Sequence, residues 1–80
     1  MKLDGLKKGQ GGKVFAVRCE KRTKNRLLKM GLTEGARVRF IRTSPLGDPI
    51  EIKVRDFYLA IRKSAAEKIE VTAAREEDEI

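Results

Sequence analysis

The chain has 80 residues, enough for one small domain with a modest core but too few for a deep, enclosed active site. It has no histidine and one cysteine, which leaves little from which to build a general base for neutral pH or a transition-metal site. Its apolar runs are far shorter than the roughly 18 residues that cross a bilayer, and its N-terminus lacks the apolar stretch of a signal peptide. These features predict a cytoplasmic protein without catalysis, cofactor or membrane insertion.

Charge is unevenly distributed along the chain. Lys and Arg number 19 against 12 Asp and Glu, for a net charge of +7. Residues 1–43 carry 13 basic and 3 acidic side chains, whereas residues 44–80 carry 6 basic and 9 acidic ones. A basic half of this kind fits nucleic acid, an anionic membrane or an acidic protein surface, and it also fits a plain solvated surface.

The N-terminal part predicts a turn followed by a strand. Leu3 and Leu6 are three residues apart and are expected to fold over a core as one turn, before glycines break the chain. Residues 13–19, KVFAVRC, then place apolar side chains on both faces, as in a strand that curls into a barrel. Cys19 ends this strand and is expected to be a small buried side chain.

A short helix is predicted in the segment TKNRLLKMGL. Thr23 is placed to cap its first turn, and Gly31 is placed to adopt the left-handed conformation that ends a helix. Leu27, Leu28 and Met30 form an apolar patch that is larger than one buried stripe needs on so short a helix. We expect Leu27 to face the core and the other two to face solvent.

Three further strands are predicted in the middle of the chain. A turn that ends at Gly35 precedes residues 36–44, in which apolar side chains alternate mostly with arginines. In residues 50–55 apolar and charged side chains alternate strictly, so one face should be buried and the other exposed to water. Residues 56–61, DFYLAI, repeat an alternating pattern.

The last part of the chain predicts one helical turn, a strand and a tail. Ser64 and Glu67 have the spacing of a capping box, in which a serine hydroxyl and a glutamate carboxylate bind backbone amides at a helix start. Residues 69–71 form the last strand, and the acidic residues 74–80 are expected to be a disordered tail. The whole pattern predicts a mainly β domain over residues 1–73, a small, partly open barrel of about five strands with one inserted helix.

The segment SPLGDP, residues 44–49, contains both prolines of the chain and is called the proline loop below. The prolines restrict the backbone, Gly47 permits a positive φ, and the Asp48 carboxylate can close a turn. The loop is therefore expected to be a rigid hairpin tip. No turn requires Leu46, so this side chain either folds back over the barrel or is presented outward as a contact.

Four segments occur together in a specific order and spacing over roughly residues 3–71. They are LKKGQGGKV, RLLKMGLTEGARV, SPLGDPIEIKV and YLAIRKSAAEKIEV. Together they resemble the FeoA family, small cytoplasmic accessory proteins of bacterial and archaeal ferrous iron uptake. The resemblance implies an SH3-like barrel that works with FeoB, a membrane protein with a cytosolic GTP-binding domain. The link to iron comes from this resemblance, not from metal ligands in the chain.

An adaptor of this kind needs a contact surface, for which the helix and the proline loop are the candidates. We expect the partner surface to comprise Arg26, Leu28, Met30, Pro45, Leu46, Gly47 and Asp48. A second set is expected to be structural: Gly31, Gly35, Pro49, Ser64 and Glu67. The sequence leaves open whether the chain also forms a homo-oligomer.

Two alternatives are a small-barrel nucleic-acid-binding protein and a metal-dependent regulatory protein, either of them using the basic half. Barrels that bind nucleic acid usually expose aromatic side chains on which bases stack. Most of the four aromatic residues here are expected to face the core: Phe15, Phe40, Phe57 and Tyr58. No helix-turn-helix is predicted. Specific nucleic-acid binding is therefore not expected.

Overall fold

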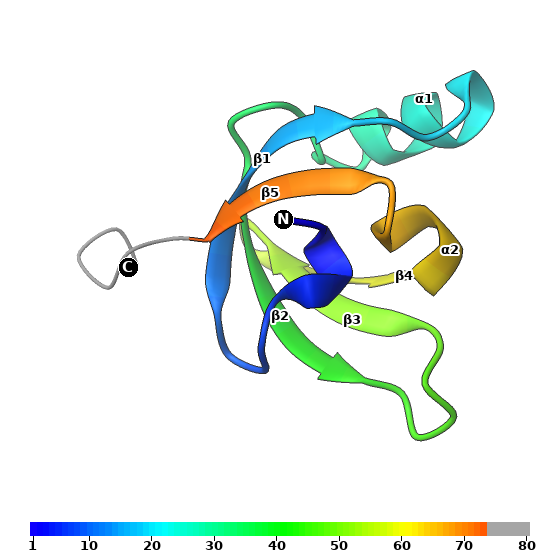
Figure 1. Ribbon diagram of the computed structural model, residues 1–80. Helices are drawn as coiled ribbons and strands as arrows, with labels where there is room; N and C mark the ends of the chain where they lie inside the picture. Colours follow the sequence, from blue (N-terminus) through cyan, green and yellow to red (C-terminus); the bar gives the residue numbers. More distant parts are fainter. Residues whose placement is uncertain (74–80) are drawn as a thin grey trace.

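The structure is a computed structural model that describes residues 1–73, so the predicted tail at 74–80 lies outside the described residues. Five antiparallel strands form one curved sheet in the order β4-β3-β2-β1-β5 (Figure 1). The elements in chain order are η1 (Leu3–Gly5), β1 (Gly11–Val17), α1 (Lys21–Lys29), β2 (Arg37–Thr43), β3 (Ile50–Val54), β4 (Phe57–Ile61), α2 (Lys63–Ala66) and β5 (Ile69–Ala73). The mainly β, partly open barrel predicted from the sequence is confirmed.

The alternation in β2 and β3 places most of their apolar side chains in the core. In the register of this pair, Val38 lies opposite Val54 and Phe40 lies opposite Ile52. All four side chains are at most 5% exposed. Burial of one face fixes the register, because a slip by one residue would turn every one of these side chains towards water.

Strand β1 begins two residues earlier than predicted, because its glycines belong to the sheet. Gly12 pairs with Val38 on one side and with Ala73 on the other. A Cβ atom on Gly12 would lie 3.2 Å from the Thr72 carbonyl oxygen and 3.3 Å from Leu6 Cδ1. Gly12 therefore permits a close approach of backbones at this point of the strand, where the sequence predicted only a break.

The two N-terminal leucines and the cysteine pack against the same core. Leu3 and Leu6 are 0% and 5% exposed, as expected for a turn that covers the barrel. Cys19 lies just beyond the end of β1, where its thiol donates a hydrogen bond to the Ala65 carbonyl oxygen at 3.6 Å. Burial raises the pKa of the Cys19 thiol. The side chain is only partly buried, so the expectation of a buried thiol holds in part.

The predicted helix is present, but its first turn differs from the prediction. Helix α1 begins at Lys21 with Glu20 as the preceding cap residue, so Thr23 lies inside the helix. The Thr23 hydroxyl donates to Glu20 Oε1 at 3.0 Å and caps no backbone amide. The end of the helix is as predicted, because Gly31 has a φ of +96° directly after the cap residue Met30.

The predicted capping box in α2 is wrong. Helix α2 begins at Lys63, and its cap residue Arg62 makes no side-chain hydrogen bond to the helix. The Lys63 N–H instead donates to Asp48 Oδ1 at 2.9 Å. An acceptor from the proline loop thus takes the place predicted for Ser64, and Glu67 forms the other end of the turn.

Helices α1 and α2 lie at the same end of the barrel, on the side of the loop that joins β2 to β3 (Figure 1). Strands β4 and β5 are the edges of the sheet, and α2 joins them in the chain. The turn η1 packs against α2 and β5. No helix within residues 1–73 is long and apolar enough to cross a membrane.

Candidate functional site

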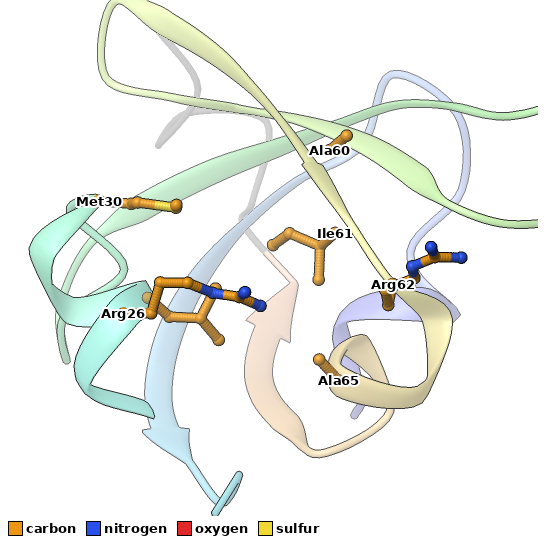
Figure 2. Close-up of a pocket in the computed structure, with 7 residues that line it drawn as sticks. Arg26, Met30, Ala60, Ile61, Arg62 and Ala65 are labelled. Atoms are coloured by element: carbon orange, nitrogen blue, oxygen red, sulfur yellow. The ribbon is translucent and has the colours of Figure 1, made fainter. Parts of the chain in front are cut away.

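A pocket of about 280 Å³ opens between α1, the end of β4 and α2. Its walls are formed by Arg26, Leu27, Met30, Ala60, Ile61, Arg62 and Ala65. Figure 2 shows Arg26 and Met30 extending from α1 towards Ile61 and Ala65 on the other side. The pocket is larger than the 150 Å³ or so that suffices to hold a benzene ring, so it has room for a large apolar side chain.

The inner part of this pocket is continuous with the core, whereas its rim is exposed. Leu27 and Ile61 are each 3% exposed, as expected for Leu27 from the sequence. Met30 at the rim is 36% exposed, and Arg26 is also exposed. The pocket is thus a place where core side chains can be reached from the surface.

The electrostatic character of this end of the barrel is strongly basic. Helix α1 contains five basic residues and no acidic one: Lys21, Arg22, Lys24, Arg26 and Lys29. Within residues 1–73, the side chains of Arg26 and Arg62 make neither an ion pair nor a hydrogen bond. The pocket therefore combines apolar side chains with two arginines that have no partner within residues 1–73, and of these only Arg26 directs its guanidinium across the pocket (Figure 2).

The proline loop presents Leu46 outward, which decides between the two alternatives left open by the sequence. The Leu46 side chain is 95% exposed at the tip. The Gly47 N–H donates to the Ser44 carbonyl oxygen at 2.7 Å, and the Ser44 N–H donates to the Pro49 carbonyl oxygen at 3.0 Å. Gly47 has a φ of +89°, as expected for this turn. The loop therefore holds an exposed leucine on a closed, hydrogen-bonded tip.

The Asp48 carboxylate connects this loop to the pocket. Its Oδ1 accepts the hydrogen bond from the Lys63 N–H, the first amide of α2. Arg62 and Ala65, on either side of that amide, line the pocket. The proline loop and the pocket are therefore held by the same helical turn, and Asp48 has a structural role that the sequence did not predict.

The structure brings part of the predicted surface together around the pocket. Arg26 and Met30 line it, whereas Leu28, which is 36% exposed, lies on α1 outside the lining. The sequence missed Ala60, Ile61, Arg62 and Ala65. No local signal marks these four residues, because the pocket forms only when β4 and α2 pack beside a helix 30 residues earlier in the chain.

The expectation that most aromatic side chains face the core is wrong. Only Phe40 is buried, at 5% exposure, whereas Phe15, Phe57 and Tyr58 are 49%, 42% and 64% exposed. Phe15 lies at an irregularity in the β1–β5 register, and the other two lie on the edge strand β4. A bulge changes the direction of side chains that a regular strand would turn inward. On an edge strand, no neighbouring strand covers one side of the side chains.

The described part of the chain offers no cluster of metal ligands. Within residues 1–73, no group of three His, Cys, Asp or Glu side chains lies close enough together to hold a metal ion. The Cys19 thiol, with its raised pKa and its hydrogen bond to a carbonyl, is poorly prepared to become a thiolate ligand.

Comparison with known proteins identifies close relatives of this barrel. The family model described as the FeoA domain matches residues 1–73. A fusion of Fe(2+) transport protein A with the Fe(2+) transporter FeoB from Porphyromonas gingivalis is 30% identical over 71 residues. The match covers 89% of this chain but 8% of that protein, so the chain spans less than a tenth of its relative.

Two solved structures agree in fold. The FeoA protein from Chlorobium tepidum has a TM-score of 0.90 and 39% identity, covering 94% of this chain and 71% of that one. The FeoA of Stenotrophomonas maltophilia, described as a zinc complex and a prokaryotic SH3 domain protein, has a TM-score of 0.78 and 26% identity, covering 90% and 89%. The SH3-like barrel is therefore confirmed, whereas the side chains of residues 1–73 offer no donor set that fits a resident zinc ion.

Proposed function

Because the chain belongs to the FeoA family, we propose that it is an accessory protein of ferrous iron transport that binds and modulates FeoB without catalysing a reaction itself. The observation that carries this proposal is the Porphyromonas gingivalis relative, in which a domain 30% identical to this chain is fused to FeoB. Fusion holds two domains at a high effective concentration, as expected for domains that act together. The proposed place of action is the cytoplasm, at the cytosolic part of FeoB.

The geometry supports a binding role for the end of the barrel that carries the helices. Leu28 and Met30 are exposed beside the basic residues of α1, and Leu46 is exposed on the proline loop, which Asp48 links to α2. Exposed apolar side chains beside basic ones are typical of a binding surface. The pocket lining contains arginines and apolar side chains, with no carboxylate, thiol or hydroxyl that could act as acid, base or nucleophile. This composition suits recognition of another protein better than a reaction.

The test is binding of the purified chain to the cytosolic domain of its FeoB, with GTP turnover measured in the same mixture. Leu28→Ala, Met30→Ala and Leu46→Ala are compared with Phe15→Ala, which removes another exposed apolar side chain, from strand β1. Loss of an interface anchor costs about 1–3 kcal/mol, so we expect the dissociation constant to rise roughly 5- to 150-fold for at least one of the three.

Ferrous iron uptake in cells that lack the native protein provides the second measurement. We expect the variant with the weakest binding to restore uptake least, and Phe15→Ala to restore it fully. Normal binding and uptake in all three variants would contradict the proposed surface. Absence of any binding by the wild-type chain would contradict the adaptor function itself.

A second candidate function, binding to single-stranded nucleic acid, is favoured by the outer face of the sheet. Arg39, Lys53 and Tyr58 lie side by side across β2, β3 and β4, and the Lys53 ammonium is 5.7 Å from the centre of the Tyr58 ring. Such binding would be weak in sequence preference and would fade as salt rises. Binding of a single-stranded oligonucleotide at low salt that is lost in Tyr58→Ala, by a chain that does not bind FeoB, would favour this function over the adaptor.

A further inference from the structure

The pocket between α1 and α2 combines two properties that an apolar contact surface alone does not require. It reaches core side chains, and it is lined by two arginines, Arg26 and Arg62, that have no protein partner within residues 1–73. We propose that it binds an acidic peptide segment of a partner protein. One apolar side chain of that segment enters the pocket, a neighbouring carboxylate pairs with Arg26, and Arg62 adds positive charge beside the rim.

The first argument is the size and lining of the cavity. About 280 Å³ is too much for a single ordered water and enough for a leucine, isoleucine, methionine or phenylalanine side chain. Leu27, Ile61 and Ala65 supply apolar contacts around it, and Met30 closes one side from α1 (Figure 2). Methionine is flexible enough to adapt its shape to different apolar side chains.

The second argument is the position of the charges. Figure 2 shows the Arg26 guanidinium directed across the pocket, whereas that of Arg62 is directed outward from the opposite side. A carboxylate can pair with either group through two parallel hydrogen bonds, which a guanidinium favours by its planar shape. A peptide with an acidic residue next to an apolar one therefore matches the pocket, with the carboxylate on the Arg26 side and further acidic residues near the positive charge of Arg62.

The third argument concerns the choice of occupant. A second copy that docked through the same surface would bring a helix with five basic and no acidic residues towards an identical helix, which like charges oppose. A nucleic acid offers phosphates but no isolated aliphatic group to contact Leu27, Ile61 and Ala65. Charge complementarity therefore favours an acidic peptide. This inference rests on the proposed function, because it names the kind of segment that the partner would present.

The experiment uses a fluorescein-labelled pentapeptide with leucine at its centre and Asp or Glu at the other four positions. Binding to the full chain is followed by fluorescence anisotropy at low salt. We expect saturable binding with a dissociation constant below about 1 mM. Replacing the central leucine by alanine should weaken binding about fivefold or more, because the pocket then lacks its occupant.

Variants of the protein separate the pocket from the general positive charge of α1. Arg26→Gln and Arg22→Gln remove the same charge from the same helix, but only Arg26 lines the pocket. We expect Arg26→Gln to weaken binding about tenfold and Arg22→Gln to weaken it less than twofold. Ala65→Leu fills the pocket and should also weaken binding about tenfold, provided that its NMR spectrum shows a folded barrel.

The proposal is overturned if the pentapeptide does not bind, if the alanine peptide binds equally well, or if Arg26→Gln and Arg22→Gln have equal effects. Normal binding of the pentapeptide by a folded Ala65→Leu protein would also overturn the proposal. Concentration-dependent shifts of pocket resonances without peptide would assign the pocket to a second copy and also overturn it. Binding of the pentapeptide by a chain that does not bind FeoB would leave the pocket proposal standing and contradict the proposed function.

Discussion

The proline loop and strand β3 are neighbours in the chain and use their apolar side chains in opposite ways. In β3, Ile50, Ile52 and Val54 are between 0% and 2% exposed, and charged residues alternate with them on the outer face. In the loop just before it, Leu46 is 95% exposed. One stretch of eleven residues, 44–54, thus contains both completely buried apolar side chains and an almost completely exposed leucine.

This difference separates what the chain needs to fold from what it presents to a partner. The three β3 side chains contribute to stability because folding removes them from water. Leu46 gains nothing in this way, since it is about as exposed in the folded chain as in an unfolded one. Its identity therefore points to a contact outside this domain.

The largest expected effect tests this separation through stability. Ile52→Ala should lower the free energy of unfolding by about 2–5 kcal/mol, because it leaves a cavity among completely buried side chains. Leu46→Ala should change it by less than about 0.5 kcal/mol. Urea denaturation of both variants measures the difference. A comparable loss for Leu46→Ala would show that the loop packs against the barrel in solution.

The next effect concerns the contact that fixes the loop to α2. Asp48→Ala removes the acceptor for the Lys63 N–H and should cost about 0.5–2 kcal/mol, the usual range for a lost helix cap. Ser64→Ala should cost less, because Ser64 makes no capping hydrogen bond. Urea denaturation, with hydrogen exchange of the Lys63 amide, measures both. A larger loss of stability for Ser64→Ala than for Asp48→Ala would contradict this cap and support the capping box predicted from the sequence.

The smallest effect concerns an exposed ion pair at the edge strand β5. A hydrogen bond from the Lys2 ammonium, with the nearby positive charges of the amino terminus and Arg18, lowers the pKa of Glu70 from its usual value of 4.5. Because the pKa is lower in the folded chain, the ionised Glu70 stabilises the fold above pH 4.5. This stabilisation is lost as the pH falls below that value towards the lower pKa of the folded chain. Glu70→Gln should therefore lower the urea midpoint slightly at pH 6 and leave it nearly unchanged at pH 3. Equal shifts of the urea midpoint at pH 6 and pH 3 would show that the ionised Glu70 does not stabilise the fold through this ion pair.

The sequence predicted the parts of this fold that depend on local alternation. Strands β2 and β3 and the core position of Leu27 follow from which side chains must leave water. The cap of α2 could not be predicted in this way, because its acceptor comes from Asp48, 15 residues earlier in the chain. The exposed aromatics were missed for a similar reason, since Phe15 and Tyr58 depend on a register irregularity and on an edge that only the assembled sheet defines.

The candidate site was predicted only in part. The exposed leucine at the tip of the proline loop could be suggested from its neighbours, because no turn requires it. The pocket could not, since its lining combines α1 with β4 and α2, which pack together only in the folded chain. The residues predicted on α1 form one side of it, and Arg62 on the opposite side has no distinguishing local pattern.

The most direct test of the proposed binding surface is an NMR titration of the isotopically labelled chain with the cytosolic domain of FeoB. The account predicts that the backbone amides that shift most will lie in residues 26–31, 44–49 and 60–66, around α1, the proline loop and α2. Shifts concentrated instead around Lys13, Lys53 and Tyr58 on the outer face of the sheet would contradict it.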